Sequence, residues 1–150
     1  MQTFLPYADF VRTAVALDRA RLGKQRVETL QIMRAISDPT YGWQHHPVTR
    51  MWRGYGSGLM VYQDAICDEW ARRGFADTTR ATTREALARM PADLAAYEEG
   101  RARFPPWLGR EEVHRSHRSN LLRKHPEHYA PLFPDTPPDL DYVWPGAPPA

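Results

Sequence analysis

The sequence predicts an all-α fold: a compact single-domain helical bundle with irregular loops and a proline-rich C-terminal tail. Apolar residues recur at helical spacing in several segments, helix-capping residues bracket those segments, and no stretch alternates convincingly like a half-buried strand. The 150 residues are enough for one hydrophobic core. We expect a helical domain over residues 1–130. Residues 131–150 contain seven prolines, which predicts an extended tail.

Near the N-terminus, the sequence predicts a packed segment and two helices with recognisable capping residues. Residues 1–6 are largely uncharged, with apolar side chains that could pack against the body of the protein. Asp9 is a suitable N-cap for a helix that ends near Leu17. Asp18 can cap the next helix, which we expect to end near Ile36, where a Ser-Asp-Pro sequence stops it.

This second helix is the most informative segment. Its predicted apolar side contains Leu22, Val27, Leu30, Met33 and Ile36, and its polar side contains Arg21, Lys24, Gln25, Glu28 and Gln31. The polar side could be a solvated surface in which Lys24 and Glu28 form an ion pair that contributes about 0.3–0.5 kcal/mol. It could also be a basic surface that binds a polyanion and holds one acid for chemistry.

For the middle of the chain, the sequence predicts a short helix, a hinge and a longer helix. An aromatic and imidazole-rich loop over residues 41–47 precedes a short helix over residues 48–53. The nearby glycines, Gly54, Gly56 and Gly58, predict a flexible hinge with close backbone approach. A helix should then bury the stripe Leu59, Tyr62, Ile66 and Trp70, with Cys67 as a buried thiol and Gly74 at its C-cap.

The sequence predicts three or four further helices in the last third of the helical domain. Thr82 and Glu85 are spaced as a capping box that opens a helix to Met90, and Pro91 opens another. A helix over residues 111–125 should present His114, Arg115, His117, Arg118, Arg123 and Lys124. Pro126 ends it, and one more turn follows.

Composition narrows the function classes. The net charge of +2 and pI near 8.9 lean weakly towards acidic partners. A lone Cys67 excludes an intramolecular disulfide and a Cys-cluster zinc site, and it suits a reducing compartment. No apolar run approaches the ~20 residues of a membrane span, and no signal peptide is apparent. We therefore expect a cytoplasmic protein with no membrane partner.

Two side-chain groupings could bind a ligand. Cations interleaved with aromatics, on the central helix, in the segment 43–53 and after Trp107, are typical of nucleic-acid binding. The histidine pairs at 45–46, 114/117 and 125/128 could form a metal site, although no H-E-x-x-H signature is present. Glu28 lies among cations, which favour its ionised form, so it suits a base or the stabilisation of a developing cation.

Four motifs occur in an order and spacing that resemble a known family. They are L-D-x-x-x-L-x-x-x-R-V-E ending at Glu28, G-W-x-x-H-P ending at Pro47, E-W-A-R-R-G-F ending at Phe75, and L-L-R-K-H-P-E-H-Y ending at Tyr129. Over roughly residues 1–130 the chain resembles the pyrimidine-dimer DNA glycosylases, in particular a divergent actinobacterial-type subgroup. These are small all-α base-excision enzymes, typified by a phage DNA-repair endonuclease.

The resemblance implies a DNA glycosylase with an associated abasic-site lyase, working without metal or cofactor. In this family the α-amine of the chain attacks the anomeric carbon of the sugar and forms an imine, and a nearby glutamate assists. Glu28 matches that acid, and Met1 would supply the amine. The residues expected to face double-stranded DNA are Arg21, Lys24, Gln25, Arg26, His46, Arg53, His117, Arg118 and Lys124.

This mechanism requires the fold to bring the Met1 amine beside Glu28, because several extra residues around positions 7–14 separate the two relative to the phage-type pattern. Two alternatives remain open: a non-catalytic nucleic-acid-binding module of the same fold, and a His-dependent metalloenzyme. For the first hypothesis we expect a monomer, associated with the nucleoid, that acts on damaged or modified bases.

Overall fold

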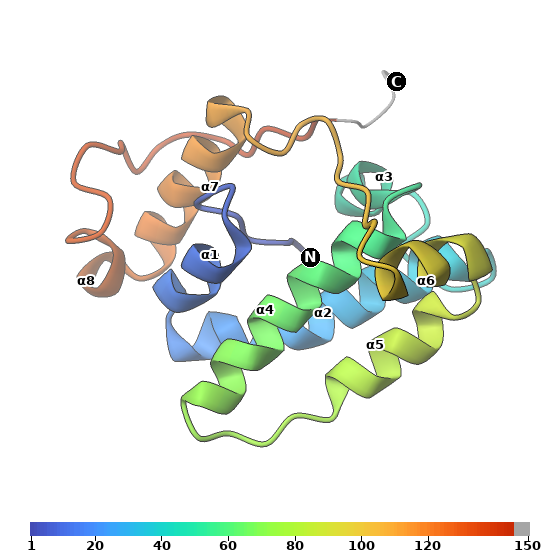
Figure 1. Ribbon diagram of the computed structural model, residues 1–150. Helices are drawn as coiled ribbons and strands as arrows, with labels where there is room; N and C mark the ends of the chain where they lie inside the picture. The colour runs from blue at the N-terminus through green and yellow to red at the C-terminus, as the bar shows by residue number, and fades with distance from the viewer. Residues whose placement is uncertain (146–150) are drawn as a thin grey trace.

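The computed structural model describes residues 1–145, and within this range the secondary structure is entirely helical (Figure 1). The prediction of an all-α fold is confirmed. The helices are α1 (Phe10–Ala16), α2 (Arg19–Ser37), α3 (Pro47–Trp52), α4 (Gly56–Arg72), α5 (Thr79–Leu87), α6 (Pro91–Glu98), α7 (Glu111–Lys124) and α8 (Pro126–Tyr129). None of those described helices is both long and apolar enough to cross a membrane.

Helices α2 and α4 cross at the centre of the molecule, and both contribute to the core. α2 packs against α3, α4 and α5, and α4 also packs against α1, α5 and α6. The predicted stripe of α4 is confirmed at Leu59, Tyr62 and Ile66, which are fully buried, whereas Trp70 stays partly exposed and packs on Phe75.

The predicted apolar side of α2 is correct except at Val27, which is 43% exposed. At about 100° per residue, Val27 lies on the opposite side of the helix from Gln25 and Thr29. Gln25 and Thr29 are buried on the inner side of the helix, where Val27 was expected. The inner side of α2 is therefore partly polar, and its polar groups need partners inside the fold.

The N-terminal segment, residues 1–6, supplies the partners of Gln25, and Gln25 in turn donates to Thr29 Oγ1. It runs into the interior between α2, α4 and α7, as Figure 1 shows, so the prediction that it packs against the body is confirmed. Buried backbone groups of an extended segment must be paired, and here side chains pair them. These hydrogen bonds are Phe4 N to Gln25 Oε1 (2.9 Å), Tyr62 Oη to the Phe4 carbonyl (2.7 Å) and Leu5 N to His117 Nδ1 (2.9 Å). The side chain of Thr3 is also paired, because its Oγ1 accepts from Trp52 Nε1 at 2.9 Å.

Capping predictions were partly right. Asp9 caps α1 by accepting from Arg12 N at 2.8 Å, and Asp18 precedes α2 without a side-chain cap bond. The capping box at Thr82 was wrong. α5 begins at Thr79 because the Asp77 carboxylate accepts from the backbone N–H groups of Thr79 (3.1 Å) and Arg80 (3.0 Å).

The predicted glycine hinge was wrong in part. Gly56 and Gly58 lie inside α4. Of the three glycines in the predicted hinge, only Gly54 has a positive φ, of 88°. The predicted close approach is confirmed at Gly58, where a Cβ atom would overlap the carbonyl oxygen of Arg103. The glycine therefore lets the chain before α7 pack directly on α4.

The tail runs along α7 over residues 131–145 (Figure 1). Side chains of α7 bind its backbone: Ser119 Oγ donates to the Pro137 carbonyl at 2.6 Å, and Asn120 Nδ2 donates to the Leu140 carbonyl at 3.1 Å. Beyond these contacts the tail brings Tyr142 and Trp144 to the N-terminal segment. The prediction for residues 146–150 lies outside the described residues.

Candidate functional site

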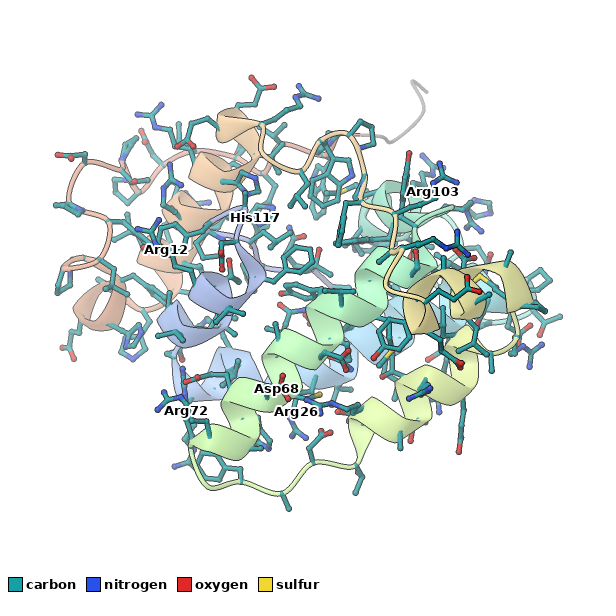
Figure 2. All side chains as sticks on the ribbon, viewed as in Figure 1. Arg12, Arg26, Asp68, Arg72, Arg103 and His117 are labelled. Carbon is teal, nitrogen blue, oxygen red and sulfur yellow. The ribbon has the colours of Figure 1, made fainter. Side chains whose placement is uncertain are left out.

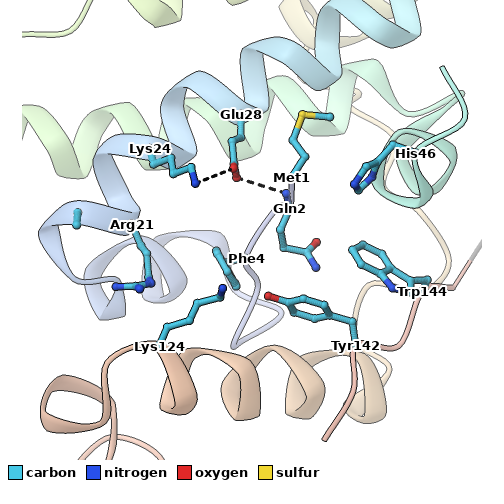
Figure 3. Close-up of a pocket in the computed structure, with 11 residues that line it drawn as sticks. Met1, Gln2, Phe4, Arg21, Lys24, Glu28, His46, Lys124, Tyr142 and Trp144 are labelled. Atoms are coloured by element: carbon cyan, nitrogen blue, oxygen red, sulfur yellow. Dashed lines mark hydrogen bonds and ion pairs between the residues drawn. The ribbon is translucent and has the colours of Figure 1, made fainter. Parts of the chain in front are cut away.

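A pocket of about 390 Å³ opens where the N-terminal segment meets α2 and the tail (Figure 3). Its size is at the lower end of the range for ligand pockets, about 300–1,000 Å³. Five separate parts of the chain contribute to it: the N-terminal segment, α2, the residue before α3, the end of α7 and the tail. The lining residues are Met1, Gln2, Phe4, Ala20, Arg21, Lys24, Glu28, His46, Lys124, Tyr142 and Trp144.

Glu28 is the acid of this pocket. Its side chain is 13% exposed, and its Oε2 accepts the backbone N–H of Gln2 at 3.3 Å. Its Oε1 lies 3.7 Å from Lys24 Nζ, so the predicted i,i+4 pair forms, but the lysine is 74% exposed. A carboxylate accepts about four hydrogen bonds, and Glu28 receives one long bond and one loose ion pair. It therefore keeps acceptor capacity for a ligand.

Met1 lies in the same pocket as Glu28. The bond from Gln2 N to Glu28 fixes the second residue against the carboxylate, and Met1 is half-buried one residue further along. The fold thus brings the first residue of the chain close to the acid on α2, across the extra residues that α1 occupies. The contact between Gln2 and Glu28 spans 26 positions of the sequence.

His46, the residue before α3, also lines the pocket. Its Nδ1 accepts the backbone N–H of Val48 at 3.1 Å and so caps α3, and its ring makes edge contacts with Trp43 and Trp144. Burial and the positive N-terminal amine lower the pKa of His46. Because Nδ1 is the acceptor, the proton of the neutral ring is on Nε2.

Cations surround the opening of the pocket. Arg21, Lys24 and Lys124 line it, together with His46, so four of the predicted DNA-facing residues lie at one site. Arg21 is held by Asp18 at 3.2 Å. Arg53 is exposed but lies outside the pocket, where it donates to the Gln44 carbonyl at 3.0 Å.

The structure places two predicted DNA-facing residues of α2 inside the fold. Gln25 is 1% exposed, and its amide holds the N-terminal segment at Phe4 N and at the Gln2 carbonyl (2.6 Å). Arg26 pairs with Asp77 at 2.7 Å and covers the ring of Trp70. Figure 2 shows Arg26 beside α4 and α5. Both side chains therefore make contacts inside the fold, and their contact with DNA stays a prediction.

Two predicted DNA-facing residues of α7 also make contacts inside the fold. His117 is fully buried, and Arg118, with a side chain 15% exposed, donates to the Pro6 carbonyl at 2.8 Å. In Figure 2, His117 lies between α7 and the N-terminal segment. The side of α7 that was expected to meet DNA instead fixes the chain's first residues.

The histidine pair 114/117 binds backbone groups. His114 Nε2 accepts the Gly109 N–H at 2.9 Å, which leaves its Nδ1–H to donate to the Leu5 carbonyl at 2.8 Å. His117 Nδ1 accepts the Leu5 N–H, so the two imidazoles hold both backbone groups of one residue. Burial lowers the pKa of both rings, that of His117 to about 3. Among residues 1–145, no three His, Cys, Asp or Glu side chains are arranged to hold a metal ion.

Sequence reasoning missed five lining residues: Gln2, Phe4, Ala20, Tyr142 and Trp144. A Tyr-Val-Trp sequence in a tail otherwise rich in proline was the one available signal for the last two. It did not indicate where on the body the tail would lie.

Comparison with known proteins decides the family. Residues 1–83, more than half of the chain, match the sequence profile of a family described as pyrimidine dimer DNA glycosylase. The chain belongs to this family. The matched range contains Met1, Gln2, Glu28 and His46, and it holds most of the residues that line the pocket. At the family level this assigns a glycosylase of DNA repair.

Another comparison is weaker. The chain is 34% identical over 67 residues to a protein of Ectopseudomonas mendocina (strain ymp) described as a putative glutamate–cysteine ligase 2. The matched region covers 45% of this chain and only 15% of that protein. No solved structure matches the chain.

Proposed function

We propose that this protein is a DNA glycosylase with an associated abasic-site lyase activity, and that it acts on damaged or modified bases in double-stranded DNA. The Met1 amine is the nucleophile and Glu28 is the assisting acid–base group. The observation that supports this most directly is the 3.3 Å bond between Gln2 N and Glu28 Oε2, which fixes the start of the chain at the carboxylate.

The chemistry follows from an amine beside a carboxylate. The neutral Met1 amine attacks the anomeric carbon, the glycosidic bond breaks, and the base leaves with the bonding electrons and gains a proton. Glu28 accepts the proton that the amine loses, and its negative charge stabilises the cationic sugar. Glu28 then returns this proton to O4′ as the C1′–O4′ bond breaks, and the opened sugar is an imine, a common covalent intermediate of amine nucleophiles. Loss of a proton from C2′ then expels the 3′ phosphate by β-elimination.

The cations at the opening supply DNA binding. Arg21, Lys24 and Lys124 lie on two different helices on either side of the pocket, as Figure 3 shows, and cations in this arrangement can contact phosphates that flank one nucleotide. The anomeric carbon is not accessible in a stacked duplex. The nucleotide must therefore leave the stack to reach the amine.

Borohydride trapping tests this function. The intact protein is incubated with a short duplex containing one abasic site, and sodium borohydride reduces the imine to a stable adduct. We expect peptide mass spectrometry to place the adduct on the nitrogen of Met1. N-terminal sequencing of the same sample verifies that Met1 is the first residue.

Matched variants identify the nucleophile. Lys24→Arg and Lys124→Arg keep the positive charge of the pocket but remove its two side-chain amines, so trapping should persist in both. Two residues added before Met1 should abolish the adduct. An adduct on a lysine would refute the role of Met1. Salt-dependent DNA binding without any adduct would support the non-catalytic module instead.

A further inference from the structure

Gln2 lines the pocket with a side chain whose orientation is fixed. The residue is 4% exposed, and its Oε1 accepts the Thr3 N–H at 3.0 Å. Its backbone carbonyl accepts from Gln25 and its backbone N–H donates to Glu28. A flipped amide would put an N–H group against the Thr3 N–H. The side-chain oxygen must therefore face Thr3, and Nε2 must face the other way.

The Nε2 atom of Gln2 is buried and has no hydrogen-bond partner. Folded proteins seldom leave a buried donor unpaired, because the donor has lost its hydrogen bonds to water without replacing them. Figure 3 shows the amide directed towards the region where Tyr142, Trp144 and His46 meet. The N–H groups of this amide thus point into a site that offers them no partner from the protein.

The surroundings of Gln2 Nε2 define what could pair with it. Tyr142 and Trp144 pack with ring centroids 5.2 Å apart, and aromatic faces of this kind stack on nucleobases. His46 adds a second donor, because its Nδ1 is occupied by Val48 and its neutral ring carries the proton on Nε2. Two fixed donors beside aromatic rings favour a flat ligand with acceptor atoms on its edge.

We propose that this pocket binds one extruded nucleobase that has a carbonyl oxygen where cytosine and adenine carry an amino group, and that Gln2 Nε2 donates to that oxygen. The inference rests on the proposed function and adds the substrate class: keto bases such as uracil, thymine derivatives and oxidised bases. If the base carried an amino group at the same position, the N–H groups of Gln2 and of the base would face each other without an acceptor. A site with such unpaired donors binds the wrong base much more weakly.

The burial of Gln2 Nε2 adds a condition. Neighbouring side chains cover the atom in the free protein, so the base must displace part of that cover. The described tail reaches this point through Tyr142 and Trp144, which are both half-buried. These are the two side chains that we expect to move apart and then stack on the base.

A binding experiment tests the base preference. Two duplexes carry one unpaired bulged base, uracil in one and cytosine in the other, so both bases leave the stack without breaking a pair. Affinities are measured by fluorescence anisotropy with the full chain. We expect the wild type to bind the uracil duplex about tenfold more tightly, the usual scale of one specific base contact.

Two variants of Gln2 test its role. Gln2→Glu keeps an acceptor for the Thr3 N–H and replaces the donor by an acceptor, so the preference for uracil should disappear or reverse. Gln2→Leu removes the donor without adding charge, so the two affinities should become nearly equal. Gln31→Glu introduces the same charge on α2 outside the pocket and should keep the preference. Melting curves verify that each variant is folded.

The outcomes separate this inference from the proposed function. Equal affinities of the wild type for the two duplexes, or an unchanged preference in Gln2→Glu, would refute base reading by Gln2 even if abasic DNA is trapped. A uracil preference that depends on Gln2, without any trapped adduct, would support the base pocket and refute the covalent mechanism.

Discussion

Charged groups on the two sides of α2 differ in how closely they are paired. On the inner side, Arg26 and Asp77 pair at 2.7 Å with side chains 16% and 10% exposed. Asp77 also receives two backbone N–H groups at the start of α5, and its hydrogen bonds outweigh burial and hold its pKa far below the usual range. On the pocket side, Glu28 has contacts of 3.3 and 3.7 Å.

The difference separates structural charge from available charge. A carboxylate whose acceptor sites are all occupied cannot take a proton or a ligand without breaking the fold around it. Glu28 is nearly as buried as Asp77 but has fewer and longer bonds, so a substrate can use it without such a loss. This contrast predicts that mutation of one acid changes chemistry, and that mutation of the other changes stability.

The largest effect should come from Glu28→Gln. The amide keeps the size of the side chain and an acceptor for Gln2 N but cannot take a proton, so we expect the rate of imine trapping on abasic DNA to fall at least ~100-fold. The melting temperature should change by at most about 2 °C, because only an exposed lysine loses its partner. Glu112→Gln, on the exposed start of α7, serves as the charge-matched control. A Glu28→Gln protein with wild-type trapping would remove the acid from the mechanism.

A smaller effect, on stability alone, is expected for Asp77→Asn. Arg26 would keep its charge in a largely buried site without a full partner, and α5 would lose part of its N-terminal cap. We expect a loss of about 2 kcal/mol in the free energy of unfolding, measured by urea denaturation. Trapping by the folded fraction should stay at the wild-type rate.

The control for Asp77 is Asp68→Asn. Asp68 pairs with Arg80, but its side chain is 70% exposed, so its loss should cost under about 1 kcal/mol. If Asp77→Asn reduced trapping as strongly as Glu28→Gln, the division of α2 into a structural side and a reactive side would be wrong.

Local patterns were enough to predict much of the fold. The spacing of Leu59, Tyr62 and Ile66 and the cap at Asp9 depend on neighbours within a few positions, and the structure confirms them. Long-range partners were not predictable. Gln25 and His117 look like surface residues in the sequence, yet they pair with backbone groups 21 and 112 positions away.

The candidate site shows the same limit. Glu28 could be singled out because it lies among cations on one helix, and the family motifs pointed to it as well. Gln2 could not, because its significance comes from an amide fixed by Thr3 and left unpaired on its other side. Tyr142 and Trp144 reach the pocket through a tail whose path depends on hydrogen bonds to α7. No periodicity encodes such a path.

Acid titration extends the contrast to the histidines. The pKa values of His114 and His117 are lowered by burial, so between about pH 6.5 and the folded-state pKa the unfolded chain binds more protons than the native protein. Stability is therefore complete above pH 6.5 and falls as the pH drops, by at most about 1.4 kcal/mol per pH unit for each histidine.

The variant His117→Gln tests this titration, since an amide oxygen can still accept the Leu5 N–H but does not titrate. Between about pH 4.5 and 6.5, we expect its stability to fall less steeply with acid than that of the wild type, as followed by urea denaturation at each pH. His46→Gln should flatten the curve less, because His46 is partly exposed at the pocket. Equal flattening by both variants would mean that the pocket histidine is as strongly shielded as the interior one, and the contrast between the two environments would not hold for histidine.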